Sequence, residues 1–334
     1  MTTTTAWVDV IILNYKGWPD TIECLESVLA LDYPNRRMIV VDNCSGDDSV
    51  PKIRDWALQK AVPHAVLDEK EIGAQVHPSE PLVLIRAERN EGYSAGNNLG
   101  IRFSLVQAKA DFVWLLNNDT TVRADSLRWL VERAGQPGAE KIGMLGSKIL
   151  FYHQPGIVQY LGGSTYRPFT GKAYPIGRGL AAADPATQQL PADRPLDFVA
   201  GAALFASTRF IRDVGELNEA YFLYFEEIDW STRGRRQGWS VSYEPRSIVY
   251  HKEGATIGAS PESRSYRAKF ADYYYHRNKF LFTRHYLGWP AFGSIYLLTV
   301  LSLFKSILNT RWVYARLFIR VLTGQTPRRY PFPD

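Results

Sequence analysis

The first 120 residues alternate between short apolar runs and segments with helical periodicity, and this alternation limits the folds open to the chain. The apolar runs are rich in Val, Ile and Leu, as buried strands are, and read VDVIILN (8–14), RMIVVD (37–42), PLVLIR (81–86) and DFVWLLN (111–117). Pro19 and Asp20 open a helical pattern after the first run, and Ser94 is the expected cap of another before the last. This order predicts an α/β fold with a mostly parallel sheet and helices on both faces.

The composition narrows the class of protein and its compartment. With 334 residues, 46% of them hydrophobic, the chain is long enough for one large domain plus an appendage. Cys24 and Cys44 are the only cysteines, which excludes a disulfide framework or a cysteine metal cage and favours a reducing compartment. The N-terminus MTTTTAWVDV lacks a basic region followed by an apolar stretch, so we expect no signal peptide.

The middle of the chain has weaker periodicity. Residues 152–195 are rich in Gly, Pro, Ala and Tyr, which predicts a long loop or a hairpin excursion. DFVAGAALFAS (197–207) predicts a strand or a buried helix. SVSYEPRSIVYH (240–251) predicts paired strands with a turn near Glu244 and Pro245.

The C-terminal region is basic and apolar. Between Tyr273 and Pro333 the chain carries nine Lys or Arg and no Asp or Glu. The uncharged run from Trp289 to Phe304 is shorter than the roughly 20 residues needed to cross a bilayer, so we expect a helix that lies in the interface of an anionic membrane surface. A buried helix packed on the main domain is the alternative. Nucleic acid is not an expected partner, because the arginines lie among apolar residues.

Polar residues end three of the predicted strands, where open parallel sheets bind their ligands. These residues are Asn14 and Tyr15, then Asp42, and then Asn117, Asn118 and Asp119. Asp42 could accept a hydrogen bond from the imide N–H of a pyrimidine base. Asp119 could ligate a hard divalent cation that bridges a diphosphate.

The segment RNEGYSAGNNLG (89–100) is the expected source of donors for such a diphosphate. Free N–H groups at a helix start bind anionic oxygen, and Gly92, Gly96 and Gly100 would let backbone approach a ligand. Close helix–sheet packing is the alternative for Gly96 and Gly100. The chain contains no G-x-G-x-x-G after the first strand, no Walker-A lysine, no H-E-x-x-H and no G-x-S-x-G, which excludes those site classes.

The segment FLYFEEIDWSTR (222–233) places Glu226, Glu227 and Asp229 directly behind an aromatic, apolar run. Desolvation and mutual repulsion make such a cluster costly, so a catalytic role is one interpretation. Acids in a first helical turn, favoured by the helix dipole, are the structural alternative. Asp229 could also pair with Arg233, four residues on.

Taken in order, these segments resemble the inverting family-2 glycosyltransferases of the GT-A fold, and in particular the rhamnosyltransferase-like branch that uses dTDP-L-rhamnose. The resemblance covers roughly residues 7–255. It rests on VIILNYKG, IVVDNCSGDDS, NEGYSAGNNLGIR, WLLNNDT, FVAGAALF and FLYFEEIDWSTRGRRQGW.

The resemblance implies roles for individual residues. The nucleotide would be bound by Asn14, Tyr15, Asp42, Asn90, Gly92 and Asn118. The metal, Mg²⁺ or Mn²⁺, would be held by Asp119, with Asn117 in place of the first acid of the usual D-x-D triplet and with His251. Glu227 would be the catalytic base, with Glu226 binding an acceptor hydroxyl and Asp229 beside them.

The resemblance also implies a function. A glycosyltransferase domain (1–258) would transfer L-rhamnose from its nucleotide-sugar donor, dTDP-L-rhamnose, to a hydroxyl of a lipid-linked or polysaccharide acceptor in cell-surface glycan synthesis. A helical tail (259–334) would hold the protein on the cytoplasmic face of the cell membrane. A UDP-sugar transferase of the same fold and a non-catalytic nucleotide-sugar-binding protein are the alternatives, and a homodimer stays open.

Overall fold

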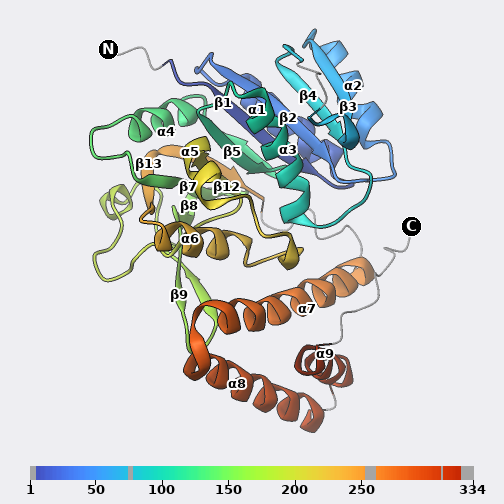
Figure 1. Ribbon diagram of the computed structural model, residues 1–334, viewed down its shortest axis with the longest axis vertical. Coiled ribbons are helices and arrows are strands. Elements are labelled where there is room, and N and C mark those ends of the chain that lie inside the picture. The colour runs from blue at the N-terminus through green and yellow to red at the C-terminus, as the bar shows by residue number, and fades with distance from the viewer. Residues whose placement is uncertain (1–4, 74–77, 253–260, 310, 325–334) are drawn as a thin grey trace. The chain divides into compact units, whose positions relative to one another are not determined.

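The computed structural model describes residues 5–73, 78–252, 261–309 and 311–324, which form two compact units (Figure 1). The first unit comprises Met1–Thr165, Tyr174–Phe222 and Glu226–Thr256. The second comprises Tyr166–Ala173, Leu223–Phe225 and Ile257–Asp334. The second unit therefore combines the C-terminal helices with two short pieces from the middle of the chain. The predicted domain boundary at residue 258 lies outside the described residues and stays a prediction.

The first unit contains a 10-stranded sheet in the order β3-β4-β2-β1-β5-β12-β7-β13-β6, with β8 paired to β7. Its strands are β1 (Val8–Asn14), β2 (Arg36–Asp42), β3 (His64–Asp68), β4 (Leu82–Arg86), β5 (Phe112–Asn117), β6 (Thr120–Val122), β7 (Ile142–Phe151), β8 (Gln154–Leu161), β12 (Ala203–Ser207) and β13 (Ser240–His251). The four predicted strands are confirmed as β1, β2, β4 and β5, and all of their mutual pairings are parallel. The sequence missed β3, because this short strand buries little apolar surface.

Helices cover both faces of this sheet, as predicted (Figure 1). They are α1 (Trp18–Leu29), α2 (Ser49–Gln59), α3 (Tyr93–Gln107), α4 (Ser126–Ala134), α5 (Thr208–Val214) and α6 (Glu226–Arg236). Successive strand side chains point to opposite faces. Val10 and Ile12 of β1 therefore pack with α1, α2 and α4, while Ile11 packs with α3, α5 and α6.

Helix α3 begins two residues earlier than expected, and the predicted cap at Ser94 is wrong. Gly92 is the residue that precedes the helix, with a φ of 100° that favours glycine. A side chain at Gly92 would also overlap the carbonyl oxygen of Phe222. The packing alternative for the other two glycines is confirmed, because a Cβ on Gly96 would overlap Leu13 and one on Gly100 would lie 2.6 Å from Ile11 Cγ2.

The segment after β7 is a hairpin excursion, one of the two predicted alternatives. It contains β8, then β9 (Gly163–Arg167) and β10 (Lys172–Pro175), and a 3₁₀ turn η2 (Pro185–Gln188). Strands β10, β9 and β11 (Phe198–Val199) form a second sheet of three strands. The run predicted at 197–207 is therefore divided between β11 and β12.

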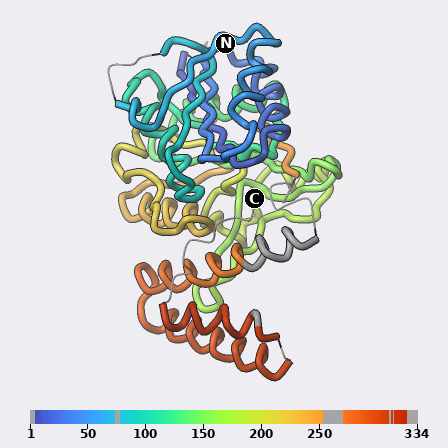
Figure 2. The backbone as a smooth tube through the Cα atoms, turned by 90° about the vertical axis from the view of Figure 1, so that its right-hand side faces the viewer, coloured from blue at the N-terminus to red at the C-terminus, as the bar shows by residue number. Residues whose placement is uncertain are grey.

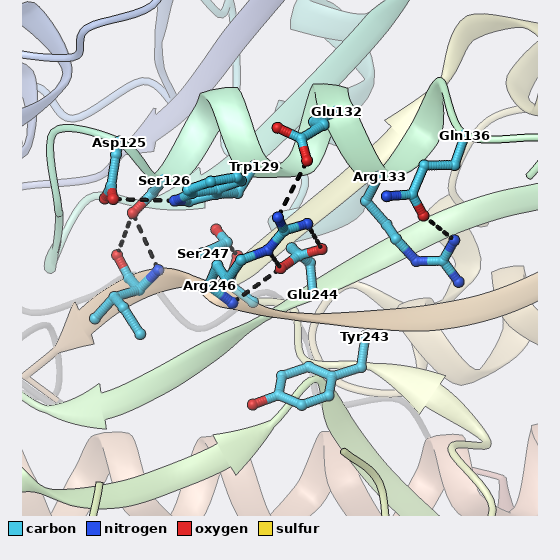
Figure 3. A network of polar contacts seen from close by, with 12 residues as sticks. Asp125, Ser126, Trp129, Glu132, Arg133, Gln136, Tyr243, Glu244, Arg246 and Ser247 are labelled. Atoms are coloured by element: carbon cyan, nitrogen blue, oxygen red, sulfur yellow. Dashed lines mark hydrogen bonds and ion pairs between the residues drawn. The ribbon is translucent and has the colours of Figure 1, made fainter. Parts of the chain in front are cut away.

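Strand β13 is continuous, so the turn predicted near Glu244 and Pro245 is wrong. The strand pairs with β7 before and after this point, with a register shift between Glu244 and Ile248. Proline cannot donate to the ladder, so Pro245 interrupts the pairing without ending the strand. Figure 3 shows Arg246, which follows Pro245 in the strand. Its Nε donates to Glu244 Oε1 at 2.7 Å, and its guanidinium carbon lies 4.0 Å from the centre of the Trp129 ring.

The second unit contains α7 (Pro261–Tyr286), α8 (Gly288–Leu308) and α9 (Trp312–Thr323), which pack on one another (Figure 2). Tyr273 of α7 and Leu317 and Phe318 of α9 form a small buried cluster. In the described part of the chain, α8 is the helix long and apolar enough to cross a membrane by length and composition, with a mean hydropathy of 1.7.

Candidate active site

The carboxyl ends of β2, β1 and β5 lie side by side at one edge of the sheet. In the parallel register, Asn14 is paired with Asp42, and Leu13 with Asn117. The polar residues that end these three strands are therefore neighbours in space, as ligand-binding edges of parallel sheets require.

Asn14 and Asp42 are joined in a buried hydrogen-bond network. The Asn14 amide donates to Asp42 Oδ1 at 2.7 Å, and its oxygen accepts from Thr21 Oγ1 at 2.8 Å. Ser45 donates to Asp42 through its backbone N–H at 3.1 Å and through its hydroxyl at 2.5 Å. These three donors, from Asn14 and Ser45, hold the carboxylate of Asp42 in one orientation. The sequence analysis missed Ser45, whose signal is its place three residues after Asp42, within reach of that carboxylate.

Asn90, Gly92 and Asn118 are fixed at the same edge by amide contacts. Asn43 donates to Asn90 Oδ1 at 3.1 Å and to the Gly92 carbonyl at 3.2 Å, which ties the end of β2 to the segment before α3. The Asn118 amide donates to the Gly17 carbonyl and to Thr21 Oγ1, each at 3.2 Å. The half-buried Tyr15 follows β1 directly. These positions agree with a common ligand, and their assignment to a nucleotide stays a prediction.

Asp119 and His251 meet although 131 residues lie between them in the chain. Antiparallel pairing of β13 with β6 places His251 opposite Thr120. His251 Nε2 then lies 3.2 Å from Asp119 Oδ1, and its Nδ1 lies 3.0 Å from Gln159 Oε1. An amide oxygen can only accept, so Nδ1 is placed to donate to Gln159, and this contact directs Nε2 toward the carboxylate of Asp119.

A histidine nitrogen and a carboxylate oxygen this close together are suited to binding one cation between them. A metal-binding histidine commonly donates its other N–H to a second residue, which is the contact made by Gln159. Asp119 is 4% exposed and could supply the charge a divalent cation requires. No third His, Cys, Asp or Glu joins this pair within the described residues, so the other ligands would come from Asn117 and from the bound substrate. The donor set fits Mg²⁺ or Mn²⁺.

Glu227 lies where α3, α6 and the loop before β12 converge. Its Oε1 is so close to Gly201 that a side chain there would overlap it. The Tyr93 hydroxyl donates to the Gly201 carbonyl at 2.9 Å, and the next residue, Ala202, accepts from the Asn117 backbone at 3.1 Å. Glu227 is thereby placed at the sheet edge that carries Asn117. The sequence carried no signal for Gly201.

Burial raises the pKa of Glu227 to about 7, although hydrogen bonds from its own backbone and from Gly201 oppose the shift. Of the two costs named for the acidic cluster, desolvation is therefore the main cause of the raised pKa of Glu227. The pKa of Tyr93 is also raised, first by burial and then by the negative charges of Glu227 and Glu226.

Asp229 is fully buried and pairs with Arg233. The guanidinium Nε donates to Asp229 Oδ1 at 2.7 Å, and the Tyr221 hydroxyl donates to Oδ2 at 3.2 Å. The pairing expected from the four-residue spacing is confirmed. This contact gives Asp229 a structural role, and its catalytic role stays a prediction. Glu226, 2% exposed, begins α6 with Glu227 in the first turn.

The backbone just before these acids is strained. Phe222, Tyr224 and Phe225 have φ values of 63°, 67° and 79°, which bulky residues rarely adopt. Each such residue costs about 1–3 kcal/mol and persists only where its surroundings hold it in place. Strained backbone of this kind is concentrated at functional sites.

The sheet, its two helical layers and this polar edge define a GT-A fold. Residues 9–144 match the model of "Glycosyl transferase family 2". The resemblance to the family-2 glycosyltransferases is confirmed over these residues, and the rhamnosyltransferase-like branch with its dTDP-L-rhamnose donor stays a prediction.

Three known proteins illustrate the similarity. A low-salt glycan biosynthesis hexosyltransferase, Agl10 of Haloferax volcanii, is 25% identical over 70% of this chain and 63% of its own. An N-acetylglucosaminyl-diphospho-decaprenol L-rhamnosyltransferase of Mycobacterium tuberculosis is 28% identical over 36% of this chain and 40% of its own. The crystal structure of GalNAc-T7 with UDP, GalNAc and Mn²⁺ is 14% identical, with a TM-score of 0.55 over 82% of this chain and 51% of that one. The chain thus spans less than two thirds of the length of the relatives it matches in sequence.

Proposed function

We propose that this protein is an inverting glycosyltransferase that moves a sugar from a nucleotide-sugar donor to a hydroxyl group of a lipid-linked or polysaccharide acceptor. The observation that carries the proposal is the convergence at one sheet edge: a buried Asn14–Asp42 pair, the Asp119–His251 pair, and Glu227 with a pKa of about 7. A base near neutral pKa is suited to general-base catalysis at physiological pH.

The donor would lie along the strand ends. The carboxylate of Asp42 would accept a hydrogen bond from the imide N–H of the base, and the hydrogen bonds of the Asn14 and Asn118 amides support this role by fixing that edge. A divalent cation held by Asp119, Asn117 and His251 would neutralise the charge of the diphosphate leaving group. These residues bind and orient the donor.

Glu227 would carry out proton transfer. The acceptor oxygen forms a bond to the anomeric carbon, and the bond from that carbon to the diphosphate oxygen breaks with its electron pair. The proton of the acceptor hydroxyl passes to the Glu227 carboxylate. Attack opposite the leaving group inverts the anomeric configuration. Glu226, beside it in the first turn of α6, would bind an acceptor hydroxyl.

For the sugar we propose L-rhamnose, from dTDP-L-rhamnose. The support is the ordered set of motifs and the similarity to the decaprenol rhamnosyltransferase. That relative's name also supports a lipid-linked acceptor. For location we propose the cytoplasmic membrane surface, supported by the apolar α8 and the basic C-terminal region.

A panel of nucleotide sugars with Mg²⁺ or Mn²⁺ tests the proposal by thermal stabilisation and by donor hydrolysis. A ligand at one hundred times its Kd stabilises by about 2.7 kcal/mol. We expect dTDP-L-rhamnose to give the largest shift and slow metal-dependent hydrolysis. Stabilisation by UDP-sugars alone would select the UDP-sugar alternative, and binding with neither hydrolysis nor transfer would select a non-catalytic protein.

A further inference from the structure

The segment Leu223–Phe225, which leads into the first turn of α6, belongs to the second unit and is held there by α7. Two of its three residues, Tyr224 and Phe225, have positive φ. The next residue in the chain is Glu226, followed by Glu227. Any change in the path of Leu223–Phe225 is therefore transmitted covalently to the two glutamates.

Asn278 of α7 is the polar contact that holds this segment. Its side chain is fully buried, and its amide donates to the carbonyls of Leu223 at 2.7 Å and Tyr224 at 2.9 Å. Its oxygen accepts from Arg277 at 2.8 Å. A side-chain amide has two N–H donors, and Asn278 donates to two adjacent backbone carbonyls. Both bonds are partly buried, and a carbonyl that loses such a partner costs free energy, so the contact favours this backbone path.

Aromatic packing fixes the end of the same segment. The ring of Phe225 lies 5.8 Å from that of Tyr275 and 5.7 Å from that of Phe282, both on α7. The ring of Tyr166 lies 6.2 Å from Phe225 in an edge-on arrangement. Asn278 and these rings thus hold both the backbone and the side chain of the segment.

We propose that Asn278 is a positioning residue for Glu226 and Glu227, and that α7 is part of the catalytic machinery as well as of the tail. The proposal rests on the proposed function for the identity of the reaction. The two carbonyl contacts stabilise the strained path that delivers the first turn of α6. Because Asn278 touches neither donor nor acceptor in this scheme, its loss should slow the chemical step without weakening donor binding.

The test compares Asn278→Ala with Thr299→Val, a control that removes a buried hydroxyl of α8 bonded at 2.8 Å to Ile295 O in the same helix. We expect Asn278→Ala to lower kcat by about 10- to 100-fold with little change in donor KM, because small misplacements of a catalytic group have effects of this size. Hydrogen exchange of the peptide covering residues 222–228 should become faster. Thr299→Val should change neither.

Unchanged kcat and unchanged exchange in a folded Asn278→Ala protein would overturn the proposal, as would a change confined to melting temperature. If Asn278→Ala does not fold, Phe225→Leu loosens the same segment and should show the same split between kcat and KM. A wild-type protein that hydrolyses no donor would refute the proposed function only. The exchange measurement would still decide whether Asn278 holds the segment.

Discussion

Glu227 has a pKa of about 7, so its carboxyl group changes charge in the pH range where the enzyme would work. The pKa of Glu227 is higher in the folded protein than in the unfolded chain. Burial of the ionised form therefore reduces stability as the pH rises from about 4.5 through 7. The same desolvation that makes Glu227 a suitable base makes the ionised site less stable.

The residue-scale prediction for the base is that Glu227→Gln lowers turnover by about 10² or more while donor binding persists. The wild-type rate should rise with pH, with a midpoint near 7, because only the ionised carboxylate can accept the proton. Above pH 7 the variant should also be more stable than wild type, by about 1–3 kcal/mol, and this gain should vanish near pH 4. Calorimetry and a pH–rate profile measure the two effects.

Glu226→Gln and Asp229→Asn are the matched controls for the base. If either abolishes turnover while Glu227→Gln retains a near-native rate, the base has been assigned to the wrong acid. Asp229→Asn should instead reduce stability, because it removes the charge that pairs with Arg233 at 2.7 Å.

The prediction for the metal site concerns the pair Asp119 and His251. Asp119→Ala should remove measurable Mn²⁺ binding and weaken the affinity for the donor diphosphate, because it deletes the anionic ligand. Gln159→Leu should lower metal affinity by about 10- to 100-fold, since it releases the ring orientation of His251. Isothermal titration calorimetry with Mn²⁺ measures the metal affinity of both variants without a turnover assay. Full activity of the wild-type protein in excess EDTA would refute the metal assignment.

At the scale of elements, the approach of α3 to β1 decides where the N-terminus of that helix lies. Gly96 and Gly100 occupy the face of α3 that packs on Leu13 and Ile11. A side chain at either position would push α3 away from the strand. The spacing of four residues already indicated a shared face, and the structure shows that this face meets the sheet.

We predict that Gly100→Ala destabilises the protein by about 1–2 kcal/mol. A Cβ there would lie 2.6 Å from Ile11 Cγ2, and the overpacking outweighs the roughly 1 kcal/mol gain in helix propensity. Gly293→Ala in α8 is the matched control, because no atom lies within 4 Å of its added Cβ, and it should be neutral or stabilising. Urea denaturation compares the two, and equal effects would contradict the packing argument.

At the scale of the whole molecule, the C-terminal helices combine an apolar surface with positive charge. Four apolar side chains at helical spacing along α8 are each more than half exposed: Leu297, Leu301, Phe304 and Leu308. Arg311 and Arg316, which follow them in the chain, are also exposed. Each basic residue near an anionic leaflet contributes about 1 kcal/mol, and salt weakens this attraction.

We predict that the protein co-sediments with anionic liposomes and that truncation after Gly288 releases it while donor hydrolysis continues. This truncation keeps α7 and with it Asn278. The triple change of Leu301, Phe304 and Leu308 to Gln should release the protein without removing a helix, whereas Arg311→Gln with Arg316→Gln should reduce binding only at low salt. Equal binding to neutral and anionic vesicles would show that electrostatic attraction does not contribute to membrane binding. Failure to bind either, together with a truncated protein that unfolds, would show that the tail is a packed core element and not an anchor.

The sequence by itself determined the parallel sheet, its helices and the polar strand ends. Local patterns are sufficient for this, because strand burial and helix periodicity are written in consecutive residues such as Val8–Asn14 and Phe112–Asn117. The candidate residues at those ends followed from the sheet alone, since parallel strands bring their carboxyl ends to one edge.

Tertiary structure decided what depends on contacts between distant segments. The partners Ser45 and Gln159, the room that Gly201 leaves for Glu227, and the burial that raises its pKa all arise from packing. The hold of Asn278 on Leu223–Phe225 is of the same kind, because 52 residues separate Asn278 from Phe225 and no local pattern links them. Long-range hydrogen bonds and desolvation have no period along a chain, so they become visible only once the chain is folded.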